Sequence, residues 1–285
     1  MVNVIRPHDM TQALDLLSQR KLTVFAGGTD LMIRHRARAG TLPDFPHDVL
    51  LINELKELRM IKIEPYSLML GAAVTFTEIL AHPDIPDYVK APLAEIASPA
   101  IRNSATIGGN IMNASPAGDA LPMLYALGAK VVLRSKLRGE WVEPIEYFIL
   151  GPKRTILKQD ELLMGVQIPL QNYSRFAYRK VGSRKANAIA KLSFYAVALF
   201  DQNNLIDCRI AFGAMGPKII RSTDVEEFIF TYSSELWIDR AYDYYEPLLN
   251  PIDDLRSTKT YRKEVALNLL RDFIEKELLN EETRV

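Results

Sequence analysis

A polar segment near the middle of the chain, Pro169 to Ser174, separates two stretches that differ in their order of secondary structure. Before it, short apolar runs typical of strands alternate with amphipathic segments typical of helices. After it, three strand-like runs are followed only by helical patterns. Mixed strands and helices, and then a compact strand meander with helices at its end, are typical of two α+β domains. We therefore expect an N-terminal domain over residues 1–170 and a C-terminal domain over residues 175–285.

The spacing of apolar residues predicts the individual elements. Strands are expected at residues 23–26, 61–63, 68–70, 130–133, 140–142, 162–168, 176–180, 192–201 and 205–212. Helices are expected at residues 75–81, 88–97, 120–127, 236–249 and 261–279, the last with Val265, Leu269, Phe273 and Leu278 on its apolar face. A further helix begins after Asp9, which can cap it, and Thr223 with Glu226 is typical of a capping box. Residues 202–204 are expected to form the turn between the last two strands.

Composition and charge exclude several classes of protein. The 285 residues include 35 basic and 35 acidic side chains, and this even balance argues against a strongly basic nucleic-acid-binding protein. No apolar run reaches the roughly 18 to 20 residues of a membrane span, and the N-terminus lacks the apolar core of a signal peptide. The only cysteine is Cys208, which excludes a disulfide framework and a cysteine-held iron–sulfur cluster within this chain. The four histidines share no metal-ligand spacing, so we expect a soluble, cytoplasmic protein without a metal site of its own.

A first glycine loop, Ala26 to Asp30, lies between a predicted strand and a predicted helix. Paired glycines allow backbone N–H groups to converge without obstruction by Cβ atoms, and such loops bind anions. The hydroxyl of Thr29 can add a donor. Alone, this signal is weak, because the loop has neither the Lys-Ser/Thr of a phosphate-binding P-loop nor the spacing of a Rossmann fingerprint.

A second glycine loop of similar chemistry, Thr106 to Asn110, follows about eighty residues later and continues through polar residues to Asp119. Two such loops could hold a pyrophosphate from both sides, with Asp119 accepting hydrogen bonds from ribose or ribitol hydroxyls, and a dinucleotide is the ligand that suits this arrangement. The alternative is a pair of tight turns, with Asp119 capping the helix that begins at Ala120. The sequence pattern alone leaves both interpretations open.

Further motifs accompany the two loops: Ile101-Arg102-Asn103, Asn113-Ala114-Ser115-Pro116, Gly151 with Thr155, Asp160 to Pro169, Tyr178 to Arg184, and Asp253 to Arg262. With the loops, they resemble the FAD-binding (medium) subunit of the molybdenum hydroxylases. This family includes the flavin chains or domains of xanthine, carbon monoxide and nicotinate dehydrogenase. The motifs occur in the family's order over nearly the whole chain, and their joint order and spacing are specific.

The resemblance implies a two-part FAD-binding domain of the vanillyl-alcohol-oxidase (PCMH) type, followed by a small C-terminal domain with an antiparallel sheet and helices. It implies that the diphosphate of FAD is wrapped by Val24, Phe25, Ala26, Gly27, Gly28, Thr29, Asp30 and Leu31, and by Thr106, Ile107, Gly108, Gly109 and Asn110. Asp119 would bind a cofactor hydroxyl, Leu163 would touch the flavin through its backbone, and Lys180 would lie near the isoalloxazine.

Two positions depart from the family pattern. Ile96 stands where some relatives have an aromatic residue beside the cofactor, so a stacking contact would be lost. Ala188 precedes Ile189-Ala190 where many relatives have an acidic residue, which affects the field at the flavin.

The resemblance implies an oxidoreductase subunit that takes electrons from 2Fe–2S clusters of a small subunit and passes them to an acceptor, NAD⁺ being expected. A large subunit would hold molybdopterin. No residue of this chain is assigned as a general acid or base, because the chemistry belongs to the cofactor. Two alternatives remain: a stand-alone FAD-dependent reductase or oxidase of the same fold, and a scaffold subunit that has lost FAD.

Overall fold

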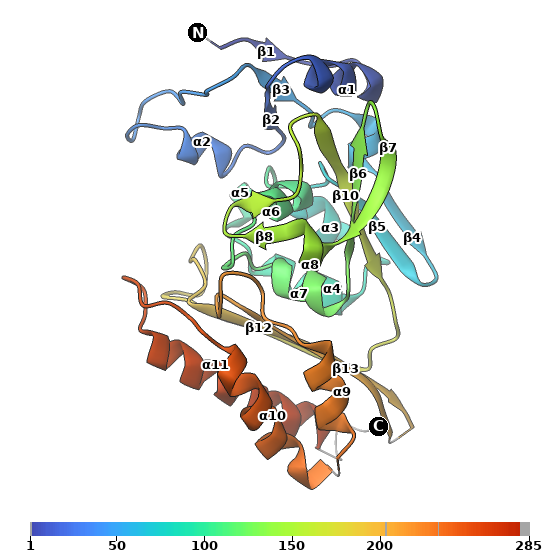
Figure 1. Cartoon of the computed structure of the whole chain (residues 1–285), viewed down its shortest axis with the longest axis vertical. Helices are drawn as coiled ribbons and strands as arrows, with labels where there is room; N and C mark the ends of the chain where they lie inside the picture. The colour runs from blue at the N-terminus through green and yellow to red at the C-terminus, as the bar shows by residue number, and fades with distance from the viewer. Residues whose placement is uncertain (1, 203, 233, 280–285) are drawn as a thin grey trace. The chain divides into compact units, whose positions relative to one another are not determined.

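A computed structural model describes residues 2–202, 204–232 and 234–279 and divides the chain into two compact units (Figure 1). The first unit contains the residues up to Ile85, together with Ala97–Ala114 and Ala129–Pro169. The second contains Pro86–Ile96, Ser115–Gly128 and the chain from Leu170 onward. Both units are therefore built from segments that are not contiguous in sequence.

The first unit mixes short helices with three sheets. Its strands are β1 (Val4–Ile5), β2 (Thr23–Phe25), β3 (Val49–Leu51), β4 (Ile61–Glu64), β5 (Ser67–Gly71), β6 (Lys130–Ser135), β7 (Gly139–Pro144), β8 (Ile149–Gly151), β9 (Arg154–Thr155) and β10 (Glu161–Pro169). Its helices are α1 (Met10–Gln19), α2 (Leu31–Arg34), the 3₁₀ helix η1 (Lys56–Arg59), α3 (Phe76–Ala81), α5 (Pro99–Arg102), α6 (Ile107–Asn113) and α8 (Ile145–Phe148).

Two of these sheets position the glycine loops. A parallel three-stranded sheet has the order β1-β3-β2, and the first glycine loop leaves it at the end of β2. An antiparallel five-stranded sheet has the order β4-β5-β10-β6-β7, and α1 and α6 pack against its central strand β10. Strand β10 reads as a nearly continuous apolar run because it is covered in this way, and its residues from Glu161 to Val166 are all buried.

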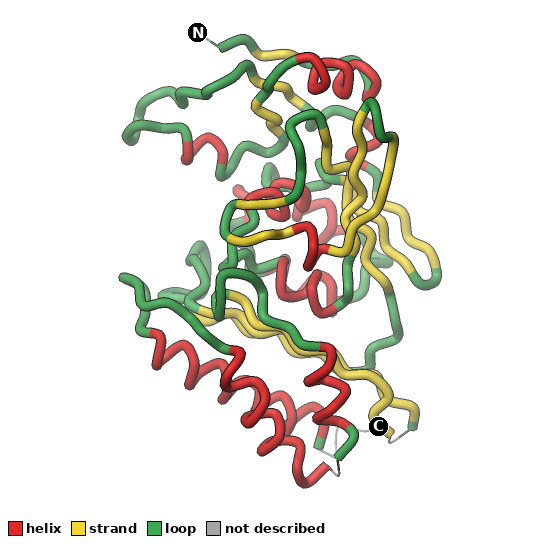
Figure 2. Tube along the Cα trace, in the orientation of Figure 1, coloured by secondary structure: helices red, strands yellow, loops and turns green. Residues whose placement is uncertain are grey.

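The second unit is an antiparallel sheet with helices. Its strands are β11 (Arg175–Val181), β12 (Leu192–Asp201) and β13 (Asn204–Gly213), in the order β11-β12-β13. Its helices are α4 (Asp87–Ala94), α7 (Leu121–Ala126), α9 (Thr223–Phe230), η2 (Ser234–Leu236), α10 (Trp237–Tyr245), η3 (Glu246–Leu248), α11 (Lys259–Phe273) and the π-helical η4 (Ile274–Leu278). The expected C-terminal architecture, an antiparallel sheet with helices, is thus confirmed (Figure 2), and α4 and α7 come from earlier parts of the chain.

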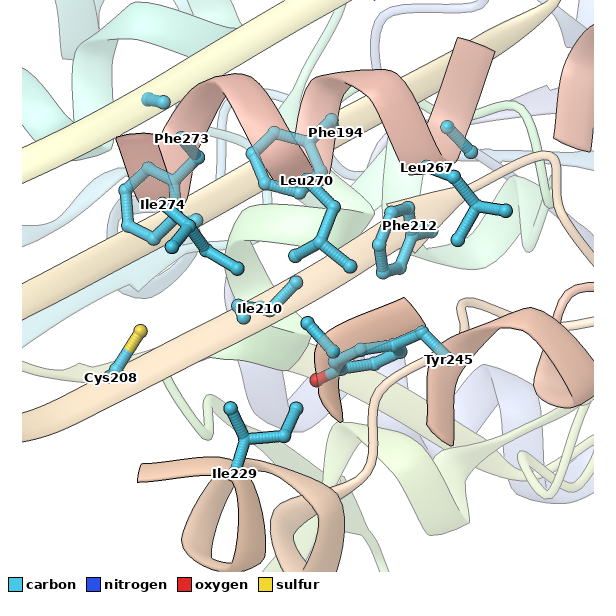
Figure 3. Packing of buried hydrophobic residues seen from close by; sticks show 14 of the residues in the cluster. Phe194, Cys208, Ile210, Phe212, Ile229, Tyr245, Leu267, Leu270, Phe273 and Ile274 are labelled. Atoms are coloured by element: carbon cyan, nitrogen blue, oxygen red, sulfur yellow. The ribbon is translucent and has the colours of Figure 1, made fainter. Parts of the chain in front are cut away.

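The two faces of this sheet are buried by different helices, as the alternation of side chains along a strand requires. On one face, Phe194, Ile210 and Phe212 pack with residues of α9, α10 and α11 in one hydrophobic cluster (Figure 3). On the other face, α7 packs against β12 and β13, and the hydroxyl of Tyr195 donates to the carbonyl oxygen of Tyr88 in α4 at 2.9 Å. Cys208 lies in the helix-covered cluster as a buried free thiol.

Three predictions about local structure are wrong. Residues 107–113 form α6, although the glycines suggested a loop. Ser222 rather than Thr223 caps α9, because its extended backbone lets its Oγ accept from the N–H of Val225. Glu226, predicted for the capping box, is buried and accepts from the N–H of Ile210 instead.

The strands were largely predicted at the right places. Helix α1 begins after Asp9, whose side chain accepts from the N–H of Gln12 as expected. The predicted helix at 261–279 corresponds to α11 and η4, but Val265 and Leu269 are only partly buried. The predicted turn includes Asn203, which lies outside the described residues.

Candidate functional site

The first glycine loop follows β2 and depends on both of its glycines. A Cβ atom on Gly27 would lie 1.8 Å from the carbonyl oxygen of Ser104. Gly28 has a φ of 72°, a left-handed conformation that favours glycine, and a Cβ there would lie 2.1 Å from the ring of Phe25. Because neither position has room for a side chain, the backbone of this loop packs directly on the segment that precedes the second loop. The two glycine loops are therefore neighbours in space.

The first loop has backbone donors that the protein does not use. Among the described residues, no partner accepts a hydrogen bond from the N–H groups of Gly27, Gly28, Thr29 or Asp30. These residues are partly or fully exposed. Successive free N–H groups in a glycine-containing turn form a concavity that suits an anion.

The second glycine loop is the first part of helix α6. Thr106 caps this helix, since its Oγ1 accepts from the N–H of Gly109 at 3.0 Å. The N–H groups of Ile107 and Gly108 each donate, at 3.0 Å, to backbone carbonyls of the segment after β5. The protein itself therefore uses the backbone donors that the sequence pattern had assigned to an anion.

The two glycines of the second loop have different surroundings. A Cβ on Gly108 would lie 2.6 Å from both the Cβ and the carbonyl oxygen of Ala72, so this glycine is required by packing inside the unit. A Cβ on Gly109 would meet only Thr106 Oγ1, at 3.0 Å, and Gly109 is exposed. Next to it, Asn110 has a buried side-chain Oδ1 with no hydrogen-bond partner among the described residues. A polar ligand at this surface could supply that partner.

Asn113 connects the two loops through its side chain. Its Nδ2 donates to Asp30 Oδ2 at 3.1 Å, at the end of the first loop. Its Oδ1 accepts from the guanidinium of Arg34 at 2.5 Å, at the end of α2. The carboxamide thus holds α2 and the end of α6 together, which fixes the first loop relative to the second.

A second group of polar residues lies in the other unit, where Lys180 of β11 meets Asp119. Lys180 Nζ lies 2.6 Å from Asp119 Oδ2 and donates to the carbonyl oxygen of Glu95 at 2.9 Å. The two side chains are only 5% and 11% exposed. The other carboxylate oxygen of Asp119 is buried and has no hydrogen-bond partner among the described residues. Asp119 does not cap α7, which has no side-chain cap, so the alternative of a simple helix cap is wrong.

Burial dominates the electrostatics of this ion pair. It raises the pKa of Asp119 to about 6, against the opposing effect of the Lys180 ammonium. Burial, followed by the charges of Asp119 and Glu95, also raises the pKa of Tyr178, and the nearby Asp119 carboxylate interacts with its hydroxyl. Buried polar groups without partners, beside a buried ion pair, are common where a ligand completes the site.

A family model described as the FAD binding domain in molybdopterin dehydrogenase matches residues 1–171, which is more than half of the chain. The chain is an FAD-binding subunit of the molybdenum hydroxylase family. A second model, the CO dehydrogenase flavoprotein C-terminal domain, matches residues 176–276. The resemblance inferred from the motifs is confirmed by both matches.

Individual relatives agree with this family. The xanthine dehydrogenase FAD-binding subunit of Escherichia coli O157:H7 is 32% identical over 78% of this chain and 77% of its own length. The glyceraldehyde dehydrogenase medium chain of Sulfolobus acidocaldarius is 30% identical over 92% of this chain and 93% of its own length. A chain in the structure of reconstituted CO dehydrogenase from Oligotropha carboxidovorans has the same fold, with a TM-score of 0.88, 21% identity and 98% coverage of both chains.

The residues present in this FAD-binding subunit fit its cofactor. FAD has an anionic diphosphate, which suits the free N–H groups of Gly27, Gly28 and Thr29. It also has ribityl and ribose hydroxyls, which suit the unpartnered buried oxygens of Asn110 and Asp119. The fit therefore rests on complementary hydrogen-bonding groups.

The structure groups the predicted cofactor residues into two sets. The first unit brings together the loop from Val24 to Leu31 and the loop from Thr106 to Asn110, and it also holds Leu163. Leu163 is buried in β10 beside an irregularity in the pairing of this strand with β6. The second unit holds the other three residues, Asp119, Lys180 and Ile96, the last of which is 7% exposed.

Sequence reasoning missed several groups that support the site. The close contact with the Ser104 carbonyl and the backbone partner at Glu95 have no side-chain signal that could have predicted them. Tyr178 could have been found, because it precedes Lys180 by two residues on a strand and therefore shares its face. Asn113 was part of the recognised motif, but its link between the loops follows only from the structure.

In residues 2–202, 204–232 and 234–279, no helix is both long and apolar enough to cross a lipid bilayer.

Proposed function

We propose that this chain is the electron-output subunit of a complex resembling xanthine dehydrogenase, in which electrons leave its FAD for NAD⁺. In this scheme, a large subunit with molybdopterin hydroxylates a purine or another N-heterocycle. A small subunit with 2Fe–2S clusters carries the electrons to this chain. The observation that carries the cofactor part of the proposal is the contact of Gly27 with the Ser104 carbonyl, because it sets the two glycine loops side by side.

The chain's own residues bind and orient the cofactor. We assign the free N–H groups of Gly27, Gly28 and Thr29 to the diphosphate, and Asn110 Oδ1 to a polar group beside the second loop. Asp119 accepts a hydrogen bond from a cofactor hydroxyl through its Oδ1, the oxygen that does not face Lys180. Bound FAD supplies the redox chemistry, since its isoalloxazine ring can take up electrons singly and give them up as a hydride.

Lys180 serves as a fixed positive charge near the isoalloxazine. Its ammonium is held by two acceptors, Asp119 Oδ2 and the carbonyl oxygen of Glu95, and its side chain is almost fully buried. A buried cation is less screened by water than an exposed cation. It therefore stabilises the negatively charged, reduced form of a neighbouring flavin more strongly. The loop that follows, with Ala188 in place of an acidic residue, adds no negative charge at that position.

The division of labour among subunits follows from the cysteine content. Cys208 is the only cysteine and is buried in the hydrophobic cluster of the second unit. Cysteine-ligated clusters of the usual kind need four thiolates, so we place them on another chain. The names of the relatives, which are subunits or medium chains of dehydrogenases, support an assembly of several polypeptides.

The test is the visible absorption spectrum of the purified chain, followed by release and chromatographic identification of the chromophore. We expect flavin bands and one FAD per chain. A colourless protein that also fails to bind added FAD would overturn the proposal in favour of a scaffold subunit.

The electron acceptor is tested on the complex purified from its own organism. An N-heterocycle substrate should drive the reduction of NAD⁺, which is followed by the absorbance of NADH at 340 nm. Flavin reduction by a substrate in the isolated chain would instead support a stand-alone enzyme.

A further inference from the structure

Residues 33–44, here named the basic loop, form a positively charged segment of the first unit. The loop contains Arg34, His35, Arg36 and Arg38 against a single carboxylate, Asp44. Arg34 is engaged by Asn113, but among the described residues no carboxylate lies within ion-pair distance of Arg36 or Arg38. Both of these side chains are exposed. The basic loop therefore carries at least two guanidinium groups that the described residues do not neutralise.

The basic loop has a defined structure. Arg36 and Pro43 form an isolated antiparallel bridge, and the N–H of Asp44 donates to the carbonyl oxygen of His35 at 2.8 Å. At its tip, Thr41 closes the turn by donating from both its N–H and its hydroxyl to the carbonyl oxygen of Arg38, at 3.2 and 2.7 Å. These contacts fix the backbone of the basic loop, while the side chains of Arg36 and Arg38 remain exposed. In Figure 1 the loop extends from α2 away from the three-stranded sheet before the chain returns to β3.

The base of the basic loop is anchored to the first glycine loop by aromatic contacts. The His35 ring lies 5.1 Å from the ring of Phe45, and Phe45 makes an edge contact with Phe25 at 6.4 Å. Phe25 is also the residue whose ring lies against Gly28. The loop is therefore held firmly at its base while its outer part projects from the unit.

Two large apolar side chains of the basic loop are exposed. Ile33 is 70% exposed and Leu42 is 90% exposed, on either side of the unpaired arginines. Arginine is enriched at protein–protein interfaces, and the exposed aliphatic side chains beside it add apolar area that a partner can cover. A phosphate or nucleotide would engage the arginines alone and leave Ile33 and Leu42 in water, so these observations favour a protein partner.

We propose that the basic loop docks a partner subunit of the same complex, through a partner face that combines carboxylates with apolar side chains. This inference rests on the proposed function, which requires partner chains. In the docked state, Arg36 and Arg38 meet the carboxylates, and Ile33 and Leu42 are covered by the apolar side chains. Charge complementarity of this kind sets association rate and specificity, and the covered apolar groups slow dissociation.

The test uses a tagged copy of the chain in its own organism, purified with the subunits that accompany it. FAD, iron and molybdenum are measured per tagged chain, and the mass of the assembly is measured by mass photometry. The key variant is Arg36→Glu/Arg38→Glu, and Leu42→Ser tests the apolar part separately. The matched control is Lys21→Glu/Lys56→Glu, which makes the same charge change at two exposed lysines of the same unit that have no ion-pair partner among the described residues.

We expect the wild type and the lysine control to carry iron and molybdenum in a constant ratio to FAD. The arginine variant should keep its FAD, but its iron and molybdenum per FAD should fall at least tenfold relative to wild type. Leu42→Ser should lower both ratios by less. The wild-type assembly should also dissociate more readily as ionic strength rises, because the arginine contacts are screened. An arginine variant that retains both metals overturns the docking proposal.

Two further results are distinguishable. If the arginine variant loses FAD while its metal-to-flavin ratio is unchanged, the basic loop serves the cofactor and the docking proposal is wrong. If the wild-type chain purifies with FAD but without iron or molybdenum, the multi-subunit part of the proposed function fails, and the docking proposal falls with it.

Discussion

Gly108 and Gly109 are adjacent in the sequence, but replacing them should have different effects. A side chain at Gly108 would collide with Ala72, so Gly108→Leu should prevent the first unit from folding. A Cβ at the exposed Gly109 would meet only Thr106 Oγ1, at 3.0 Å, which a small shift can relieve, so Gly109→Leu should fold and lose FAD. Far-UV circular dichroism and flavin content separate the two outcomes. Normal flavin content in Gly109→Leu would show that the cofactor does not approach this helix turn.

The buried carboxyl of Asp119 should make the stability of the FAD-free chain depend on pH. Its folded pKa, about 6, lies above the ordinary value of 3.8 for an aspartate, so the folded state binds the extra proton between these values. Stability from this group is therefore present below about pH 4 and is lost as the pH rises through 6, by on the order of 3 kcal/mol. Urea unfolding at several pH values should show this slope in the wild type and a smaller one in Asp119→Asn. Equal slopes in the two proteins would contradict the assignment.

At the scale of elements, the sequence predicted most strands but missed α6. Alternating or continuous apolar runs identify strands such as β10 and β12 directly. Helix α6 contains Gly108 and Gly109, which have poor helix propensity, and it forms because tertiary contacts require glycine there. Thr106 was an available N-cap signal, since a threonine before a short apolar segment is typical of a helix start.

Prediction of the site was limited in the same way, by contacts between residues that are far apart in the sequence. The glycine loops could be found from sequence because glycine pairs are visible as motifs. The sequence could not predict which backbone N–H groups remain free, because Ile107 and Gly108 donate to residues about 35 positions earlier. The pairing of Asp119 with Lys180 joins residues 61 positions apart, and no local pattern predicts such a contact.

Helix α11 holds the loop before it through a buried arginine, and this element can be tested separately. Arg262 is 1% exposed, and its guanidinium donates to Asp254 at 2.6 Å and to the carbonyl oxygen of Lys191 at the start of β12. Arg262→Met should lower the free energy of unfolding by about 1–3 kcal/mol, because it removes the hydrogen bonds of a buried guanidinium to Asp254 and to the Lys191 carbonyl. Arg256 also binds Asp254 but is exposed, so Arg256→Met should cost less than about 1 kcal/mol. Urea unfolding of both variants checks the contrast, and equal losses would contradict it.

At the scale of the whole molecule, the compact units do not coincide with the family-model boundaries. The first family model covers residues 1–171, whereas α4 and α7, which fall within it, belong to the second compact unit. Helix α7 is buried along its whole length and packs on β12 and β13. The second unit therefore obtains part of its core from a segment that precedes β11 by about fifty residues.

This interleaving predicts that fragments cut between the two matched families will not fold alone. A fragment of residues 1–171 would expose the apolar surface of α7, and a fragment from residue 172 onward would leave the α7-facing side of β12 and β13 uncovered. Both surfaces are large and apolar, so each fragment should aggregate, whereas co-expression should yield a soluble pair. Size-exclusion chromatography and circular dichroism of each fragment, and of the pair, provide the measurement. A cooperative thermal transition in the isolated 172–285 fragment would show instead that its sheet and C-terminal helices suffice for folding without α4 and α7.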